Sequence, residues 1–250
     1  MLAGILSTAT AFTFWGIFPV YLKLLRSVPP LEILSHRVVW SIAFLSLVLL
    51  WRRQWGWIAK IRGNPRIALT FIASAAALGA NWVMYIWAIN ADRIIDASLG
   101  YFITPLFNVL FGLLLGERLR PTHWLAVALA ACGVGWLTLS AGQVPWIGLL
   151  LAVTFSLYGL LRKTAALGAL EGLTVETLVM LPLAAGFLLL SGGDSSLASS
   201  HAFGSSWSLS LLLALAGPIT AVPLLLFGFG ARRIPLSIVG LLQYIGPSIQ

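Results

Sequence analysis

The ionisable residues of this chain that could do chemistry are few, and one group of them lies in an apolar stretch. Glu32, His36 and Arg37 follow Pro29 and Pro30, and proline is common at the first turn of a helix. Glu32 and His36 are four residues apart, so they share a helix face. Arg37 would lie about one and a half turns inside the helix. Two interpretations are open: the three residues line a polar cavity, or Glu32 complements the helix N-terminus and Arg37 extends back to a polar surface.

Uncharged polar and aromatic side chains recur in similar apolar stretches. They supply hydrogen-bonding groups and flat apolar walls, which are the components of a site for a small amphipathic molecule. Contacts between helices use the same residue types, so this alternative stays open for each of them. These further cavity candidates are Asn81, Trp82, Tyr85, Tyr101, Phe102, Thr104, Asn108, Tyr158, Gln243 and Tyr244.

Two prolines form a pair because each follows an aromatic stretch. Pro105 comes after Tyr101 and Phe102, and Pro247 comes after Tyr244. A proline inside a helix removes one backbone hydrogen bond and favours a kink. We expect this pair either to act as matching gates or to bend two helices for packing.

Signatures of catalysis and of metal binding are missing from the sequence. It contains no HExxH, Gly-x-Ser-x-Gly or Walker A motif, and its three histidines lie far apart. With the single cysteine, Cys132, neither an intramolecular disulfide nor a multi-cysteine metal site can form. We expect Cys132 to be a small packing residue, and we expect no enzyme activity, metal or cofactor.

The composition shows what surrounds these residues. Of 250 residues, 60% are hydrophobic and only 9% are charged, with a mean hydropathy of +0.98. Soluble domains carry about 25% charged residues, so an ordinary water-soluble fold is excluded. The net charge of +8 comes from basic residues between apolar runs, not from a basic patch, so we expect no nucleic-acid partner.

The apolar runs predict an all-α, polytopic membrane helix bundle. About 20 helical residues cross the roughly 30 Å core of a lipid bilayer. Nine runs approach this length, and the ninth reaches the end of the sequence. They are residues 3–22, 34–51, 67–90, 97–115, 123–140, 145–161, 175–191, 209–230 and 235–250.

The basic residues predict the orientation of the bundle. Eleven of the 15 fall on one side of the predicted spans, whereas Lys23, Arg26, Arg37 and Arg93 fall on the other. Because basic residues collect in cytoplasmic loops, we expect a cytoplasmic N-terminus. The Ser- and Gly-rich tract 191–208 would then be a flexible outer loop. The eleven are Arg52, Arg53, Lys60, Arg62, Arg66, Arg118, Arg120, Arg162, Lys163, Arg232 and Arg233.

The chain also matches itself weakly when it is shifted by 142 to 144 residues. The shift places Glu32 on Glu176 and Pro105 on Pro247. A unit of five spans would make the second copy cross the membrane in the opposite sense, as in many secondary transporters. We therefore expect two inverted repeats, residues 1–142 and 143–250. The second copy ends three residues after Pro247, so we expect a complete version to have ten spans.

Seven segments of the chain carry a resemblance to a known family. They are LEILSHRVVWS (31–41), GANW (79–82), WAIN (87–90), ASLGYFITPL (97–106), LGER (115–118), YGLLRK (158–163) and QYIGP (243–247). Together they resemble the RarD-type proteins of the EamA group, within the drug/metabolite transporter superfamily. The resemblance implies an inner-membrane carrier of ten helices, with a central cavity lined mostly by the first four helices of each half. Thr104 stands where the family usually has Asn, so a single hydroxyl replaces an amide there.

The leading functional hypothesis is a secondary carrier that exports small metabolites or drugs by alternating access. Arg37 would attract a carboxylate, and the aromatic residues would pack against the apolar part of an amino-acid-like substrate. Because the chain has no ATP-binding motif, transport would use a gradient of protons or other ions. One alternative is a membrane scaffold or assembly protein, and another is an intramembrane enzyme. A watery cavity that reaches the middle of the membrane would favour the carrier over the scaffold.

Overall fold

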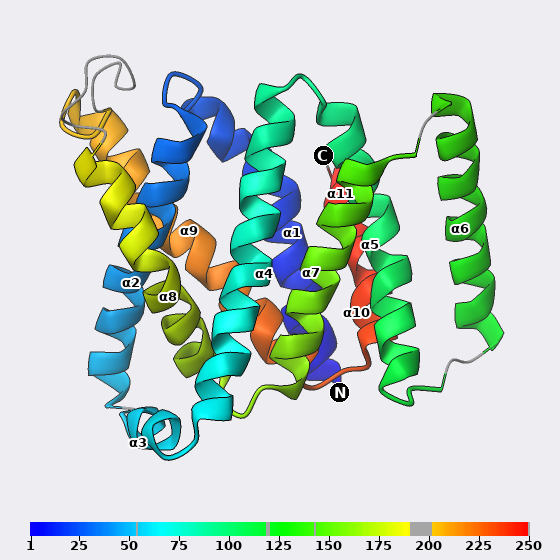
Figure 1. Ribbon diagram of the computed structural model, residues 1–250, viewed down its shortest axis with the longest axis horizontal. Helices are drawn as coiled ribbons and strands as arrows, with labels where there is room; N and C mark the ends of the chain where they lie inside the picture. The colour runs from blue at the N-terminus through cyan, green and yellow to red at the C-terminus, as the bar shows by residue number, and fades with distance from the viewer. Residues whose placement is uncertain (54, 119–120, 143, 191–201, 250) are drawn as a thin grey trace.

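The computed structural model describes residues 1–53, 55–118, 121–142, 144–190 and 202–249, which form helices joined by turns (Figure 1). Among them, seven helices are long and apolar enough to cross a membrane. They are α1 (Leu2–Leu24), α2 (Pro30–Arg52), α4 (Pro65–Asn90), α5 (Ile94–Leu114), α7 (Trp146–Thr164), α8 (Ala169–Leu190) and α9 (Trp207–Ala231). This confirms the prediction of a polytopic membrane helix bundle.

The other described helices are not counted among these seven. They are α3 (Gly56–Gly63), α6 (Pro121–Ala141), α10 (Leu236–Gln243) and α11 (Ile245–Ile249). A search for long apolar runs overlooks α3, whose Trp57 and Ile61 pack against a cluster of Phe71, Ala165 and Leu167. The predicted last span is divided at Tyr244 into α10 and α11.

The start of α8 also differs from the prediction. The helix begins at Ala169, whereas the apolar run was expected to begin at residue 175. Glu171 lies in its first turn, where a negative charge complements the helix dipole. A boundary drawn from the absence of charge therefore falls too late, and Glu176 lies about two turns inside the helix.

Helices from the first and last parts of the chain interleave. α9 packs against α1 and α2, while α7 packs against α4 and α5. α8 packs against α2 and α4, and α10 and α11 contact α5 and α1. Figure 1 shows α6 at the edge of this arrangement, where its packing partner is α5.

An aromatic cluster forms the centre of the bundle. The ring of Phe227 on α9 lies 6.0 Å from Phe12 and 5.7 Å from Trp15, both on α1. The same ring lies 5.4 Å from Phe155 and stacks on Tyr158 at 5.8 Å, both on α7. The cluster therefore joins α1, α7 and α9 by edge and stacking contacts between rings.

The expectation that Cys132 is a packing residue is wrong, because Cys132 is exposed on α6. Large apolar side chains of the same helix are also exposed, among them Leu129, Trp136 and Leu139. In a membrane protein such a surface fits the lipid, so apolar character alone does not distinguish a packed helix face from a lipid-facing one.

Candidate functional site

Arg37 lies where four helices meet. The residue is half-buried on α2, and its Nε donates a hydrogen bond to Thr220 Oγ1 of α9 at 2.9 Å. Its guanidinium carbon lies 4.4 Å from the centre of the Trp82 ring on α4 and 5.1 Å from that of Phe18 on α1. This is cation–π geometry on two aromatic side chains. The charge is therefore held inside the bundle.

Three tyrosines complete the surroundings of Arg37. The hydroxyl groups of Tyr21, Tyr85 and Tyr101 interact electrostatically with its guanidinium. The rings of Tyr85 and Tyr101 meet edge to face at 6.2 Å, and the Tyr21 hydroxyl donates to the carbonyl of Leu212 at 2.9 Å. A positive charge among aromatic rings and hydroxyl groups can bind a carboxylate while rings cover an apolar body.

A cavity of about 10 Å³ lies beside this group, between α2, α4, α8 and α9. Trp82 and Thr220 line it and also contact Arg37. Such a volume holds about one water molecule, whereas a site for a drug-sized molecule has roughly 300–1,000 Å³. The structure therefore shows this region closed. The other lining residues are Val38, Ser41, Leu173, Thr177, Met180, Ala221 and Leu224.

Glu32 and His36 lie together, but their partners are Ala202 and Phe203 and not the residues around Arg37. Glu32 Oε1 is 4.0 Å from His36 Nε2, and it accepts the backbone N–H of Ala202 at 2.9 Å. The imidazole ring of His36 stacks on Phe203 at 5.1 Å. The two side chains thus attach the start of α2 to the segment before α9, whereas Arg37 points to Thr220 and Trp82.

The three predicted amide side chains, Asn81, Asn108 and Gln243, connect helices. Asn81 donates to the carbonyl of Leu151 at 2.9 Å and to Thr154 Oγ1 at 3.0 Å, which ties α4 to α7. Asn108 Nδ2 donates to Gln243 Oε1 at 3.1 Å, which ties α5 to α10. These amides have partners within the bundle in this closed state.

The next candidates lie on α5, at the junction of α10 and α11, and in α11. Thr104 donates to the carbonyl of Gly100 on its own helix at 2.6 Å. The Tyr244 hydroxyl donates to the carbonyl of Phe102 at 3.3 Å, and the two rings are 6.4 Å apart. α5 continues through Pro105, whereas α10 ends before Tyr244 and Pro247 lies in α11. The two prolines therefore do not occupy equivalent helix geometries.

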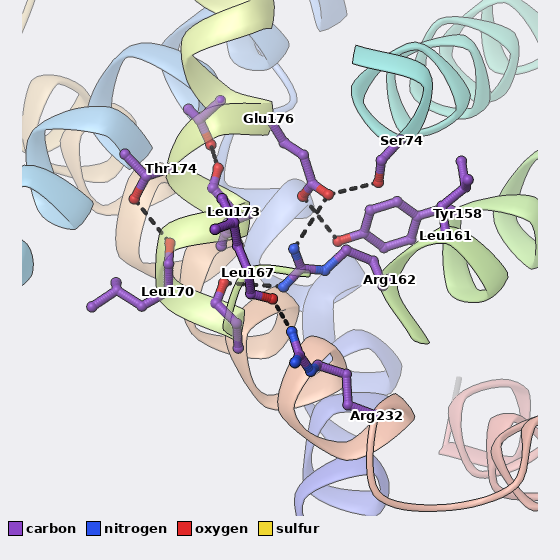
Figure 2. Close-up of polar contacts among 12 residues, drawn as sticks. Ser74, Tyr158, Leu161, Arg162, Leu167, Leu170, Leu173, Thr174, Glu176 and Arg232 are labelled. Carbon is purple, nitrogen blue, oxygen red and sulfur yellow. Dashed lines mark hydrogen bonds and ion pairs between the residues drawn. The ribbon is translucent and has the colours of Figure 1, made fainter. Parts of the chain in front are cut away.

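A second polar cluster is centred on Glu176 of α8, whose side chain is fully buried (Figure 2). Ser74 of α4 donates to Glu176 Oε1 at 2.6 Å, and Arg162 Nη1 of α7 lies 3.4 Å from the same oxygen. The Tyr158 hydroxyl donates to Oε2 at 3.5 Å. A carboxylate, a guanidinium and two hydroxyl groups thus meet inside the bundle.

The position of Arg162 corrects a sequence-based expectation. We counted it among the basic residues outside the spans, but it lies in the last turn of α7 with 0% of its surface exposed. Its Nη2 donates to the carbonyl of Ala169 at 3.0 Å, and its Nε has no hydrogen-bond partner among the described residues. A Cβ added at Gly228 would lie 2.6 Å from Nη2, so α9 passes close to the guanidinium at this glycine.

Arg232 lies next to this cluster, just after the end of α9, and donates to the carbonyl of Leu167 (Figure 2). Burial lowers the pKa of the Arg232 guanidinium, and the positive charge of Arg162 lowers it further. The protonation of Arg232, at the end of α9, therefore depends on the charge of Arg162.

Sequence reasoning missed Glu176 and Thr220 as site residues. Glu176 carried a signal, because the internal repeat aligns it with Glu32, but the late boundary predicted for α8 placed it near the membrane surface. Thr220 carried none, because a threonine in an apolar helix commonly bonds to its own backbone. Only the crossing of α2 and α9 shows that its hydroxyl faces Arg37.

Residues 2–139 match the EamA-like transporter family. The uncharacterized transporter YojE of Bacillus subtilis is 45% identical over 251 residues, covering 98% of this chain and 82% of YojE. The protein RarD of Escherichia coli is 44% identical, covering 98% of this chain and 82% of RarD. The chain therefore belongs to the EamA-like transporter family and is a RarD-type, multi-pass membrane transporter.

Two further similarities are weaker. The chloramphenicol-sensitive protein RarD of Pseudomonas aeruginosa is 34% identical, covering 98% of this chain and 82% of that protein. One crystal structure superposes with a TM-score of 0.74 over 98% of this chain and 85% of its own, at 20% identity. At that identity the likeness concerns the fold alone.

Among the described residues no group of three or more His, Cys, Asp or Glu side chains could hold a metal ion.

Proposed function

We propose that this transporter exports small amphipathic molecules that carry a carboxylate, and that Arg37 binds this group. The observation that carries the proposal is the position of the guanidinium between Trp82, Phe18 and Thr220, next to the cavity. A charge held inside a membrane bundle is costly and usually functional. Arginine also binds a carboxylate through two parallel hydrogen bonds. The aromatic rings then cover the apolar part of the substrate.

Alternating access between two inverted halves, residues 1–142 and 143–250, is the proposed transport mechanism. The pairing of helices supports it, because contacts between the halves occur in matched sets. The contact of α1 with α9 corresponds to the contact of α7 with α4. The contact of α2 with α9 likewise corresponds to that of α8 with α4. Finally, the contact of α5 with α7 corresponds to the contacts of α10 and α11 with α1. Two halves with matched contacts can rock about a shared site, and the closed cavity then represents one stage of the cycle.

The proposed location is the inner membrane, with the N-terminus in the cytoplasm. Basic residues at the end of α2, in α3 and at the start of α4 support this orientation, because cytoplasmic segments collect Lys and Arg. Figure 1 shows α3 at the same end of the bundle as the N-terminus. The segment at 202–206, before α9, would then face outward. The other part of the expected outer loop, residues 191–201, lies outside the described residues.

The test is efflux of a panel of amino-acid-like metabolites and drugs from vesicles that contain the purified protein. We expect carboxylate-bearing substrates to be transported, with rates falling in the order wild type, Arg37→Lys and Arg37→Ala. Lysine keeps the charge but lacks the planar fork of arginine. A charge-assisted contact is worth about 1.5–3 kcal/mol, so Arg37→Ala should weaken apparent affinity roughly ten- to a hundredfold.

Membrane levels of the variants are matched so that folding and binding effects are separated. Wild-type affinity and rate in Arg37→Ala would remove Arg37 from the substrate site. A wild-type protein that moves no member of the panel, with or without proton and sodium gradients, would favour the scaffold alternative.

A further inference from the structure

Glu176 is a buried carboxylate that the proposed substrate site does not use. The substrate site lies around Arg37, whereas Glu176 is held by residues of α4 and α7. Removing a carboxylate from water disfavours its charged form unless opposite charge and hydrogen bonds compensate. The groups around Glu176 therefore decide whether it holds a proton.

The compensation of the Glu176 charge is incomplete. The short bond comes from the neutral hydroxyl of Ser74 at 2.6 Å, whereas Arg162 and Tyr158 lie at 3.4 and 3.5 Å. Arg162 divides its donors between Glu176 and the carbonyl of Ala169, and its Nε is unpartnered among the described residues. A long contact of this kind leaves room for a proton to compete with Arg162 for the carboxylate.

We propose that Glu176 is the proton-binding site that couples transport to a proton gradient, with Arg162 as the counter-charge that is released when the proton binds. This proposal rests on the proposed function as a secondary transporter. A proton from the aqueous phase forms an O–H bond on a Glu176 oxygen, and the ion pair with Arg162 is lost. The net charge of the pair changes from zero to plus one, and release of the proton restores it.

Arg162 has a route out of the cluster when its partner is neutral. It is in the last turn of α7, which ends at Thr164, so its long side chain can extend toward the aqueous end of the bundle. A buried guanidinium without a counter-charge is strongly unfavourable. Proton binding thus favours a second position of Arg162, and two positions of one charged side chain make a two-state element.

The other charged groups near the pair lie on the helices packed against it. From α7, Arg162 and Tyr158 act on Glu176, and α4 contributes the neutral hydroxyl of Ser74. At the end of α9, Arg232 acts on Arg162, while Arg233 and Glu171 act on Arg232. α2 presents Val38 and Ser41 to the cavity, and its Glu32 and Arg52 lie toward its two ends. Arg37 lies beside the cavity, where it contacts Thr220 and Trp82. Arg162 is therefore the charge that responds directly to Glu176.

The cluster is connected to the cavity through two helices. Thr177 follows Glu176 directly on α8 and lines the cavity, as does Leu173 one turn earlier. Tyr158, which donates to Glu176, stacks on Phe227 of the central aromatic cluster at 5.8 Å. A change in the ion pair therefore acts on the wall of the cavity and on the packing of α7 against α9.

Infrared difference spectroscopy of the full chain in lipid, recorded across the pH range in which it stays folded, tests proton binding. We expect a carboxylic acid carbonyl band that titrates and that is absent in Glu176→Gln. Ser74→Ala removes a hydrogen bond from the carboxyl group, so the band should move to higher frequency. Ser74→Ala also assigns the band if Glu176→Gln does not fold. A spectrum in which no titrating band depends on Glu176 or Ser74 overturns the proposal.

Transport measurements test coupling. A proton gradient directed into the vesicle should accelerate wild-type efflux of a transported panel member, whereas Glu176→Gln should retain exchange of labelled for unlabelled substrate without acceleration. Glu171→Gln, on the same helix, is the matched control and should behave as the wild type. Equal acceleration in Glu176→Gln overturns the proposal. A wild-type protein without any transport contradicts the proposed function, while the infrared titration still decides whether Glu176 binds a proton.

Discussion

Single side chains at the α3 end of the bundle attach helices to one another. Glu117, just after α5, accepts the backbone N–H groups of Leu236 at 2.7 Å and Ser237 at 3.1 Å. These N–H groups belong to the first turn of α10, so the carboxylate acts as a cap supplied from a distant part of the chain. Lys163 Nζ lies 3.3 Å from the same carboxylate and donates to the carbonyl of Ile234 at 2.6 Å.

We predict that Glu117→Ala destabilises the protein by about 2 kcal/mol, because the start of α10 loses its cap and Lys163 loses its counter-charge. Thermal unfolding of the purified protein in detergent measures the effect. Glu171→Ala, which changes a carboxylate in the first turn of α8, is the matched control and should stay within about 0.5 kcal/mol of the wild type. Equal stabilities of Glu117→Ala and the control would show that the contacts of Glu117 do not hold α10.

The contrast between Arg37 and Arg162 shows how far residue types predict a site. Arg37 could be selected from the sequence because its charge stands within an apolar run after a helix start. Arg162 could not, because a basic residue at the end of an apolar run is typical of a cytoplasmic boundary. Its burial depends on Glu176, which lies on the next helix and reaches Arg162 only when α7 and α8 both pack against α4.

At the scale of elements, the crossing of α5 and α7 depends on two glycines. A Cβ added at Gly148 would lie 2.9 Å from the backbone nitrogen of Gly100 and 3.0 Å from the carbonyl oxygen of Asp96. Backbone atoms cannot move aside as a flexible side chain can. The two helices therefore approach closely only because neither position carries a side chain.

We predict that Gly148→Ala destabilises the protein by about 1–3 kcal/mol through overpacking at this crossing. Gly186→Ala, in α8, is the matched control, because an added Cβ there meets no atom within 4 Å. Alanine favours a helix over glycine by about 0.5–1 kcal/mol, so the control should be neutral or slightly stabilising. Equal unfolding temperatures of the two variants would contradict the close approach of α5 and α7.

Most of the helices could be predicted from the sequence, because each must satisfy its own backbone hydrogen bonds across an apolar layer. The short α3 could not, since eight residues with two basic side chains form no long apolar run. The division at Tyr244 could not either, since it leaves the mean hydropathy of the run unchanged. The cavity could not be predicted from the sequence either. Val38, Thr177, Thr220 and Leu224 come from three helices, and no local pattern indicates that they face one another.

At the scale of the whole molecule, helices from the first part of the sequence pack against helices from the second part. Arg37 comes from the first half, and its hydrogen-bond partner Thr220 comes from the second. Glu176 in the second half likewise binds Ser74 in the first. Each site therefore combines residues from the first and the second part of the chain, and the proposed rocking movement would change both.

The most direct test of this account asks whether the closed cavity opens to both sides of the membrane. Ser41 lines the cavity and is buried, and its hydroxyl donates to the carbonyl of Gly217 at 3.1 Å. Ser41→Cys is placed in a Cys132→Ser background and treated with a membrane-impermeant maleimide in vesicles of either orientation. Lys60→Cys and Ser208→Cys, both at exposed positions, mark the two faces.

We predict that Lys60→Cys reacts only from the cytoplasmic face, Ser208→Cys only from the outer face, and Ser41→Cys from each face in turn. A transported substrate should slow the reaction at position 41, because it occupies the same space. Reaction at position 41 from one face only, or from neither, would contradict alternating access.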